Sequence, residues 1–352
     1  MGEPVKLDRV PGREPSLDLM RSLGAFAVVM IHVSAVPAAA VDMASATWWT
    51  ANFLNAGSRW GDAIIIMSAG AILLGRPADR DPAAFLRARF LRLLPAVVFW
   101  TVFYLLWRGW TTGLPSAGEL MSELLRGSPY YHMWFLYMMV GMYLAIPLIR
   151  ALVSLPDTRL HYYLLGLCAL LTPVEALSRI VLGMSHASFL GLFPLFLVYL
   201  VGGYLLYRDR PVVPTWVLIL VPCVCIAIEA LGVAFLHPLL GEPVFKLMYT
   251  NRGPLVMVAT FCLFLLGLRA KGGALTRWHQ NGGEVLARVT LGVYMLHPFW
   301  IDVLARNGLG PLYASMTPAP FELPLATLLV FFLSVVCSLA MSRIPALRRV
   351  VI

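Results

Sequence analysis

The sequence predicts an all-α integral membrane protein, a polytopic bundle of about ten transmembrane helices. Of its 352 residues, 60% are hydrophobic and only 13% are charged, whereas a soluble domain carries roughly 25% charged residues. A soluble fold of this size would expose more apolar surface than water tolerates, so lipid must be the solvent. At roughly 20 residues per span, the chain accommodates about ten spans with short connections.

Ten apolar stretches along the chain are predicted to be the spans. The second stretch is the weakest, because Asn55, Arg59 and Asp62 interrupt its first half. Polar groups at such depth face other helices or a cavity rather than lipid. The ten stretches are residues 21–41, 53–75, 91–110, 132–152, 161–182, 188–207, 215–236, 250–268, 285–305 and 323–343.

The distribution of basic residues predicts the orientation. With ten spans and both termini in the cytoplasm, 20 of the 27 Lys and Arg residues fall in or near cytoplasmic connections and 7 in outer ones. This is the bias that the positive-inside rule describes. Residues 1–20 are thus predicted to be a cytoplasmic segment, 21–343 the membrane domain and 344–352 a cytoplasmic tail. The net charge of +9 follows from this topology, and no nucleic-acid partner is expected.

The first apolar stretch has two interpretations. Its basic start, apolar run and small residues Ala38–Ala40 imitate a signal peptide that would be cleaved near Val41. An uncleaved first span is favoured, because the chain then alternates correctly across the membrane. The five cysteines all lie in apolar stretches and are read as small buried residues, so neither a disulfide framework nor a metal site is predicted.

Arg21 and His32 are the candidate catalytic residues. Eleven residues at 100° each make three helical turns plus about 20°, so the two side chains share one face of the first span. Their axial separation is roughly 16 Å, which places His32 near the midplane if Arg21 lies at the cytoplasmic rim. A packing histidine is the alternative. Ionisable groups at that depth usually mark a pathway or reaction site, and histidine suits proton transfer near neutral pH.

A basic segment precedes the third span. It contains five arginines between residues 76 and 92, and Arg89 and Arg92 share a helix face at i and i+3. The arginines either anchor the topology or form a phosphate clamp, because guanidinium forks match phosphate oxygens. With Arg21 and Arg87, they are predicted to hold a nucleotide-like cofactor such as coenzyme A, whose thioester arm would reach toward His32.

Four motifs in order resemble the bacterial acyltransferase-3 family of membrane O-acyltransferases, nearly end to end. The motifs are Arg21-x10-His32, Arg89-Phe-Leu-Arg92, His132-Met-Trp-Phe-Leu-Tyr137 and Tyr294-Met-Leu-His-Pro298. Residues 48–59 are similar to the exopolysaccharide and surface-antigen branch. One motif departs from the family pattern: Ala69 stands directly before Gly70 where the family usually has serine, and Ser68 is one place early. A catalytic serine is therefore not predicted.

The resemblance implies O-acetyl transfer in a bacterial inner membrane. Acetyl-CoA from the cytoplasm would be the donor, with no permanently bound cofactor. The acceptor would be a sugar hydroxyl of a cell-surface polysaccharide or its lipid-linked precursor. His32 would be the catalytic base or a transient acyl carrier. The rival interpretation is a transporter or flippase for such sugars, with His32 as a proton relay.

Five residues are candidate acceptor contacts, each with a structural alternative. Arg59 could bind a diphosphate or carboxylate of the acceptor, or extend to the membrane interface. Trp134 and Tyr137 could stack on a sugar or belong to an aromatic belt. Asn52 and His297 are included on the family resemblance, and a helix-packing role is the alternative for His297.

Three further polar residues are given structural interpretations. His161 and His279 fall in cytoplasmic connections and are expected at the surface, and Glu229 is expected at the outer interface.

Overall fold

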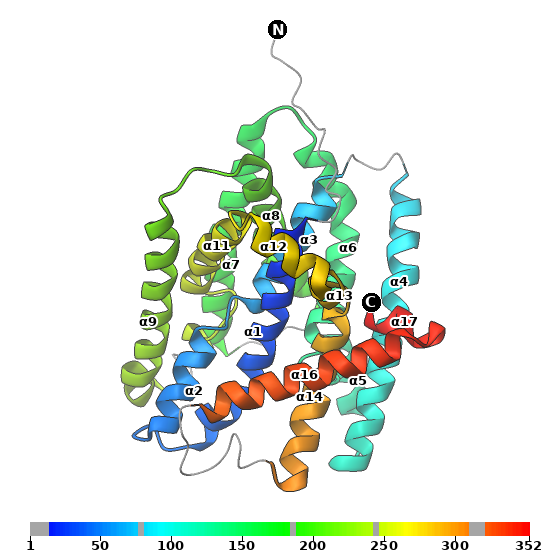
Figure 1. Cartoon of the computed structure of the whole chain (residues 1–352), viewed down its shortest axis with the longest axis vertical. Helices are drawn as coiled ribbons and strands as arrows, with labels where there is room; N and C mark the ends of the chain where they lie inside the picture. The colour runs from blue at the N-terminus through cyan, green and yellow to red at the C-terminus, as the bar shows by residue number, and fades with distance from the viewer. Residues whose placement is uncertain (1–13, 77–80, 184–187, 242–245, 310–320) are drawn as a thin grey trace.

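The computed structural model describes residues 14–76, 81–183, 188–241, 246–309 and 321–352. Of the described residues, 83% are helical and none lies in a strand. Figure 1 shows most of the helices running up and down a single bundle, while α16 crosses its front face obliquely. The principal helices are α1 (Pro15–Ala40), α2 (Ala46–Ala56), α3 (Gly61–Leu74), α4 (Pro82–Thr111), α6 (Trp134–Val153), α7 (Thr158–Leu182), α8 (Leu197–Asp209), α9 (Thr215–Leu240), α11 (Pro254–Leu268), α14 (Thr290–Leu304) and α16 (Glu322–Ser342).

The protein is a polytopic membrane bundle, as the composition predicts. Within the described ranges, seven helices are long and apolar enough to cross a membrane. An eighth span is α11 together with Gly273–Arg288, if this pair, bent by 92°, is one broken span. All ten predicted stretches contain helix, but α3, α11 and α14 have only 14 or 15 residues. The total of ten spans, like the cytoplasmic placement of the termini, stays a prediction.

The predicted second span is wrong as one continuous helix, because a turn divides residues 53–75. Helix α2 ends at Ala56 and α3 begins at Gly61. The indole N–H of Trp60 closes the turn by donating to the carbonyl oxygen of Gly57 at 2.7 Å. The expectation that this region is buried against other helices is confirmed, since Asn55 and Asp62 are buried.

Glycines bring α3 into backbone contact with α8. A Cβ atom at Gly70 would lie 2.0 Å from the carbonyl oxygen of Leu200, and one at Gly203 would lie 2.1 Å from that of Met67. Small residues permit such close helix packing in membranes, where van der Waals contact drives association. Helix α3 is thereby held at the centre of the bundle, with the side chains of Ile66 and Met67 fully buried.

A Gly70→Val substitution is expected to lower the melting temperature strongly or to prevent recovery of folded protein. A side chain there must displace the backbone of α8, and overpacking typically costs about 1–3 kcal/mol or more. The measurement is thermal unfolding in detergent with size-exclusion chromatography. Gly166→Val in α7 is the matched control, because nothing lies within 4 Å of its Cβ position. Equal melting temperatures for the two variants would contradict the packing argument.

Among the short helices that lie outside the ten predicted stretches are α5 (Ala117–Arg126) and α17 (Pro345–Val351). Helix α5 follows α4 and starts with a capping box between Ser116 and Glu119. Helix α17 occupies the predicted tail and packs against α4, as Figure 1 shows.

Candidate active site

A cavity of about 630 Å³ opens among the start of α1, the end of α3 and the first turns of α4. Two carboxylates, Glu14 and Asp18, are outnumbered by the arginines in its wall. A partly enclosed site with this excess of guanidinium groups suits an anion that carries several charges. The lining arginines are Arg21, Arg76, Arg89, Arg92, Arg288 and Arg348.

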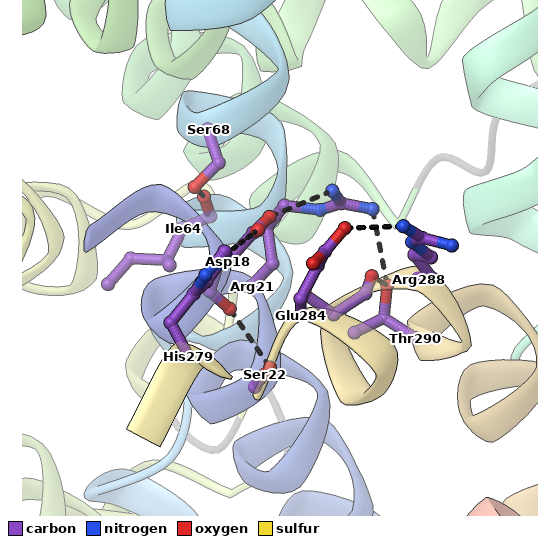
Figure 2. Close-up of polar contacts among 10 residues, drawn as sticks. Asp18, Arg21, Ser22, Ile64, Ser68, His279, Glu284, Arg288 and Thr290 are labelled. Carbon is purple, nitrogen blue, oxygen red and sulfur yellow. Dashed lines mark hydrogen bonds and ion pairs between the residues drawn. The ribbon is translucent and has the colours of Figure 1, made fainter. Parts of the chain in front are cut away.

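Arg21 is held in the cavity wall by two neighbours, as Figure 2 shows. Its guanidinium lies 3.6 Å from the Asp18 carboxylate and donates to the Thr290 hydroxyl at 3.4 Å. His279 Nε2 lies 3.0 Å from the other carboxylate oxygen of Asp18. The chain His279–Asp18–Arg21–Thr290 therefore ties α1 to the π-helical turn His279–Gly283 and to α14. The expected surface position of His279 is wrong, because tertiary contact with α1 buries most of its side chain.

The predicted clamp residues separate into two groups in the structure. Arg89 and Arg92 line the cavity together with Arg21, and the Arg89 guanidinium lies 5.3 Å from the ring centre of Phe85 and 6.0 Å from that of Tyr143. Arg87 is exposed on another side of α4 and does not line the cavity. Helix geometry explains the difference, since Arg87 lies about 200° around the helix from Arg89.

Three cavity arginines were not among the predicted site residues. Arg76 follows α3, Arg288 ends the short helix α13 (Glu284–Arg288), and Arg348 lies on α17. Each stands at the end of an apolar stretch, where arginine is the ordinary topological anchor. No local spacing distinguishes them from anchors, so only the arrangement of the helices assigns them to the cavity.

His32 belongs to a cluster of three histidines in the bundle interior. Its ring stacks on that of His297 with centroids 5.0 Å apart, and His297 lies 5.5 Å from His132. The side chains of His132 and His297 are 0% exposed, and neither ring nitrogen of either residue has a hydrogen-bond partner within the described part of the chain. Buried polar atoms are rarely left unpaired, so this cluster is a site for water or a ligand.

His132 was missed as a functional candidate, although it heads one of the motifs. Its position at the start of an apolar stretch suggests an interfacial residue, and only the tertiary structure brings the turn before α6 to His297 in α14. In the portion of the chain that the structure describes, no group of histidine, cysteine or acidic side chains could hold a metal ion.

An aromatic pair in the cavity wall contacts the histidine cluster. Phe135 and Tyr294 line the cavity, and their ring centroids are 4.8 Å apart. Tyr294 lies 5.7 Å from His297, and its hydroxyl approaches the carbonyl oxygen of His132 at 3.4 Å. Tyr294 thus belongs both to the cavity wall and to the surroundings of the histidine cluster.

Tyr131 contacts His32 from another direction. The two ring centroids are 5.0 Å apart, and Tyr131 is 47% exposed. It precedes α6, whereas the cavity residue Tyr143 lies more than two turns into that helix. His32 therefore has neighbours on the cavity side and near the opposite end of α6.

Arg59 lies in a buried polar group on the side of His32 away from the cavity. Its guanidinium hydrogen-bonds the Asn55 side chain, lies 4.6 Å from the ring centre of Tyr249, and is within electrostatic reach of His32 and Glu229. Glu229 is 1% exposed, so its expected place at the outer interface is wrong. Arg59 lies in the turn between α2 and α3. This turn directs its side chain into the bundle, where it joins the buried polar group.

The other predicted acceptor contacts are engaged within the bundle. Asn52 donates to the carbonyl oxygen of Ala230 at 2.9 Å and accepts from the Tyr249 hydroxyl. Trp134 stacks on Phe196 with centroids 5.2 Å apart.

The remaining predicted polar contacts are likewise satisfied inside the protein. The hydroxyl of Tyr137 lies 2.9 Å from that of Thr101. Of the five predicted acceptor contacts, the structure brings only Arg59 and His297 close to His32. His161, expected at the surface, is buried against Arg208, whose guanidinium lies 3.0 Å from its Nδ1.

The structure also explains the departure in the serine motif. Ser68 is fully buried and donates to the carbonyl oxygen of Ile64 in its own helix at 2.8 Å (Figure 2). Ala69, at the position of the family serine, lines the arginine cavity. The position that faces the cavity thus carries no hydroxyl, while Gly70 beside it is needed for contact with α8.

Replacing Asp18 with alanine is expected to lower the melting temperature. The change leaves Arg21 and His279 without their shared partner, and removing one partner from a buried charged hydrogen bond costs about 1–3 kcal/mol. Thermal unfolding in detergent measures it. Ser22→Ala is the matched control, because the Ser22 hydroxyl bonds only the backbone carbonyl of Asp18. A stability loss confined to the Ser22 variant would refute the role given to the carboxylate.

Comparison with known proteins adds one match. Residues 14–343 match a family model that is described as an acyltransferase domain. No curated protein and no solved structure matches the chain.

Proposed function

Because this chain belongs to the acyltransferase-3 family of membrane proteins, we propose that it is an O-acetyltransferase that uses acetyl-CoA. The acceptor is a sugar hydroxyl of a cell-surface polysaccharide or of its lipid-linked precursor, in the exopolysaccharide and surface-antigen branch of the family. The protein acts in a bacterial inner membrane, with donor entry from the cytoplasm.

One observation carries the proposal: Tyr294 lines the arginine cavity and also contacts the histidine cluster that contains His32. The arginine side chains of the cavity fit the phosphates of coenzyme A, since guanidinium groups bind phosphate through paired hydrogen bonds. Arg21 and His32 are roughly 16 Å apart along α1. If the arginines hold the phosphates, the acyl arm of coenzyme A extends inward over this distance toward His32. The arm passes between Phe135 and Tyr294, whose side chains must move aside.

In the proposed reaction His32 is the general base. Its unprotonated imidazole nitrogen takes the proton of the acceptor hydroxyl, and the oxygen attacks the thioester carbonyl carbon. The carbon–sulfur bond breaks, the acetyl group remains on the sugar oxygen, and the thiolate of coenzyme A leaves and takes up the proton. His297, stacked on His32, orients the imidazole. Ser68 has no part in the transfer, because its hydroxyl is bonded within α3.

The acceptor is proposed to approach from the side of Tyr131 and Arg59. Tyr131 offers an exposed ring beside His32, and aromatic rings stack on the apolar faces of sugars. Arg59 lies on the same side of the cluster, away from the cavity. Donor and acceptor therefore reach His32 from different directions.

The test is an acetyl-transfer assay in vesicles that contain the purified protein, labelled acetyl-CoA and lipid-linked oligosaccharide. Mass analysis is expected to find sugar carrying one added acetyl group, together with free coenzyme A. Translocation of sugar without acetyl release would contradict the proposal and favour a flippase.

A further inference from the structure

Helix α17 is anchored beside the cavity by its last turn. Val350 and Val351 are buried, and the indole N–H of Trp100 in α4 donates to the carbonyl oxygen of Val350 at 2.9 Å. Gly292 in α14 makes room for this turn, because a Cβ there would lie 2.9 Å from that of Val351. The anchor fixes the position of α17 although it lies beyond residue 343, where the match to the family model ends.

Arg348 is the residue that α17 presents to the cavity. Together with Arg92 and Ile352 it also borders an adjoining groove of about 760 Å³ between α4 and α17. Arg349 lies about 100° further around the helix and borders only this groove. Of these two consecutive arginines, Arg348 lines the cavity and Arg349 does not.

We propose that Arg348 binds a phosphate of the acyl donor, and that α17 is a wall of the donor site. The inference rests on the proposed function and extends it to a helix outside the matched region. Arg348 and Arg92 both line the cavity and the adjoining groove, so a phosphate bound between them receives guanidinium groups from both α4 and α17. The phosphate of a phospholipid headgroup at the membrane rim could bind in the same way. Arg348 also lines the cavity, and this position favours the acyl donor as its ligand.

The experiment compares binding of coenzyme A to full-length wild type, Arg348→Ala and Arg349→Ala by titration calorimetry in neutral detergent. Arg348→Ala is expected to weaken binding by about 10-fold or more, as loss of one charged hydrogen bond implies. Arg349→Ala is expected to bind within about 2-fold of wild type. Arg348→Lys, which keeps the charge without the fork, is expected to lie between them and shows that α17 has not simply unfolded.

The outcomes separate this inference from the proposed function. Wild type that binds coenzyme A together with an Arg348→Ala variant that binds equally well overturns the role of Arg348 and leaves the acetyltransferase proposal standing. Wild type that binds no coenzyme A overturns both. A third outcome is that Arg348→Ala binds coenzyme A as well as wild type in neutral detergent and more weakly only when anionic phospholipid is added. That result assigns Arg348 to a lipid headgroup and overturns its assignment to the donor.

Discussion

A His32→Ala variant is expected to fold and to bind coenzyme A, while its rate of acetyl transfer falls by about 100- to 10,000-fold. General acid–base catalysis supplies a factor of this size, and alanine offers no group that can take the proton of the acceptor hydroxyl. The residual rate reflects positioning of donor and acceptor alone. The measurement is the initial rate of labelled acetyl transfer in vesicles, with donor affinity measured separately by titration.

His237→Ala is the control for this prediction, because His237 lies at the end of α9, remote from the cluster. It is expected to retain the wild-type rate. Full acetylation by a folded His32→Ala protein would eliminate His32 as the base. Loss of coenzyme A binding in the same variant would place His32 in the donor site instead.

Arg92→Ala is expected to weaken coenzyme A binding by about 10- to 100-fold and to raise the KM for acetyl-CoA in proportion. A charge-assisted hydrogen bond contributes about 1.5–3 kcal/mol, and 1.4 kcal/mol corresponds to a factor of 10 in affinity. The value of kcat is expected to change little at saturating donor, because Arg92 is proposed to contact the phosphates rather than the reacting carbonyl.

Arg87→Ala provides the matched comparison on the same helix. Arg87 is an exposed arginine that does not line the cavity, so its replacement removes the same charge without removing a ligand contact. Equal losses in the two variants would show that general positive charge near the membrane, rather than the cavity, attracts the donor. High salt would then reduce both effects together.

The relation between Arg21 and His32 illustrates what can be predicted from local sequence. Both lie on one regular helix, so their shared face follows from 3.6 residues per turn. The structure places Arg21 in the cavity and His32 in the interior cluster. The same reasoning groups Arg89 with Arg92, because three residues nearly complete a turn. The predicted clamp also includes Arg87, although it lies on another face of the helix, and it does not line the cavity.

The histidine cluster illustrates what local sequence leaves undetermined. His32 in α1, His132 in the turn before α6 and His297 in α14 come from segments that are far apart in the chain. Nothing in the spacing of one helix specifies which neighbour it contacts, because in a bilayer every apolar face is equally soluble in lipid. The contact depends on close-packing sites elsewhere, such as Gly70 against α8.

The sequence by itself determined that the protein is surrounded by lipid, that it is all-helical, and that Arg21 shares a helix face with His32 and Arg89 with Arg92. It could do so because hydropathy and helical periodicity are local properties. The tertiary structure alone decided which arginines form the cavity, that Tyr294 lines it beside the histidine cluster, and that Arg348 lines it too. These facts depend on how helices pack side by side. That packing is set by shape and hydrogen bonding between distant segments, which leave no periodic trace in the sequence.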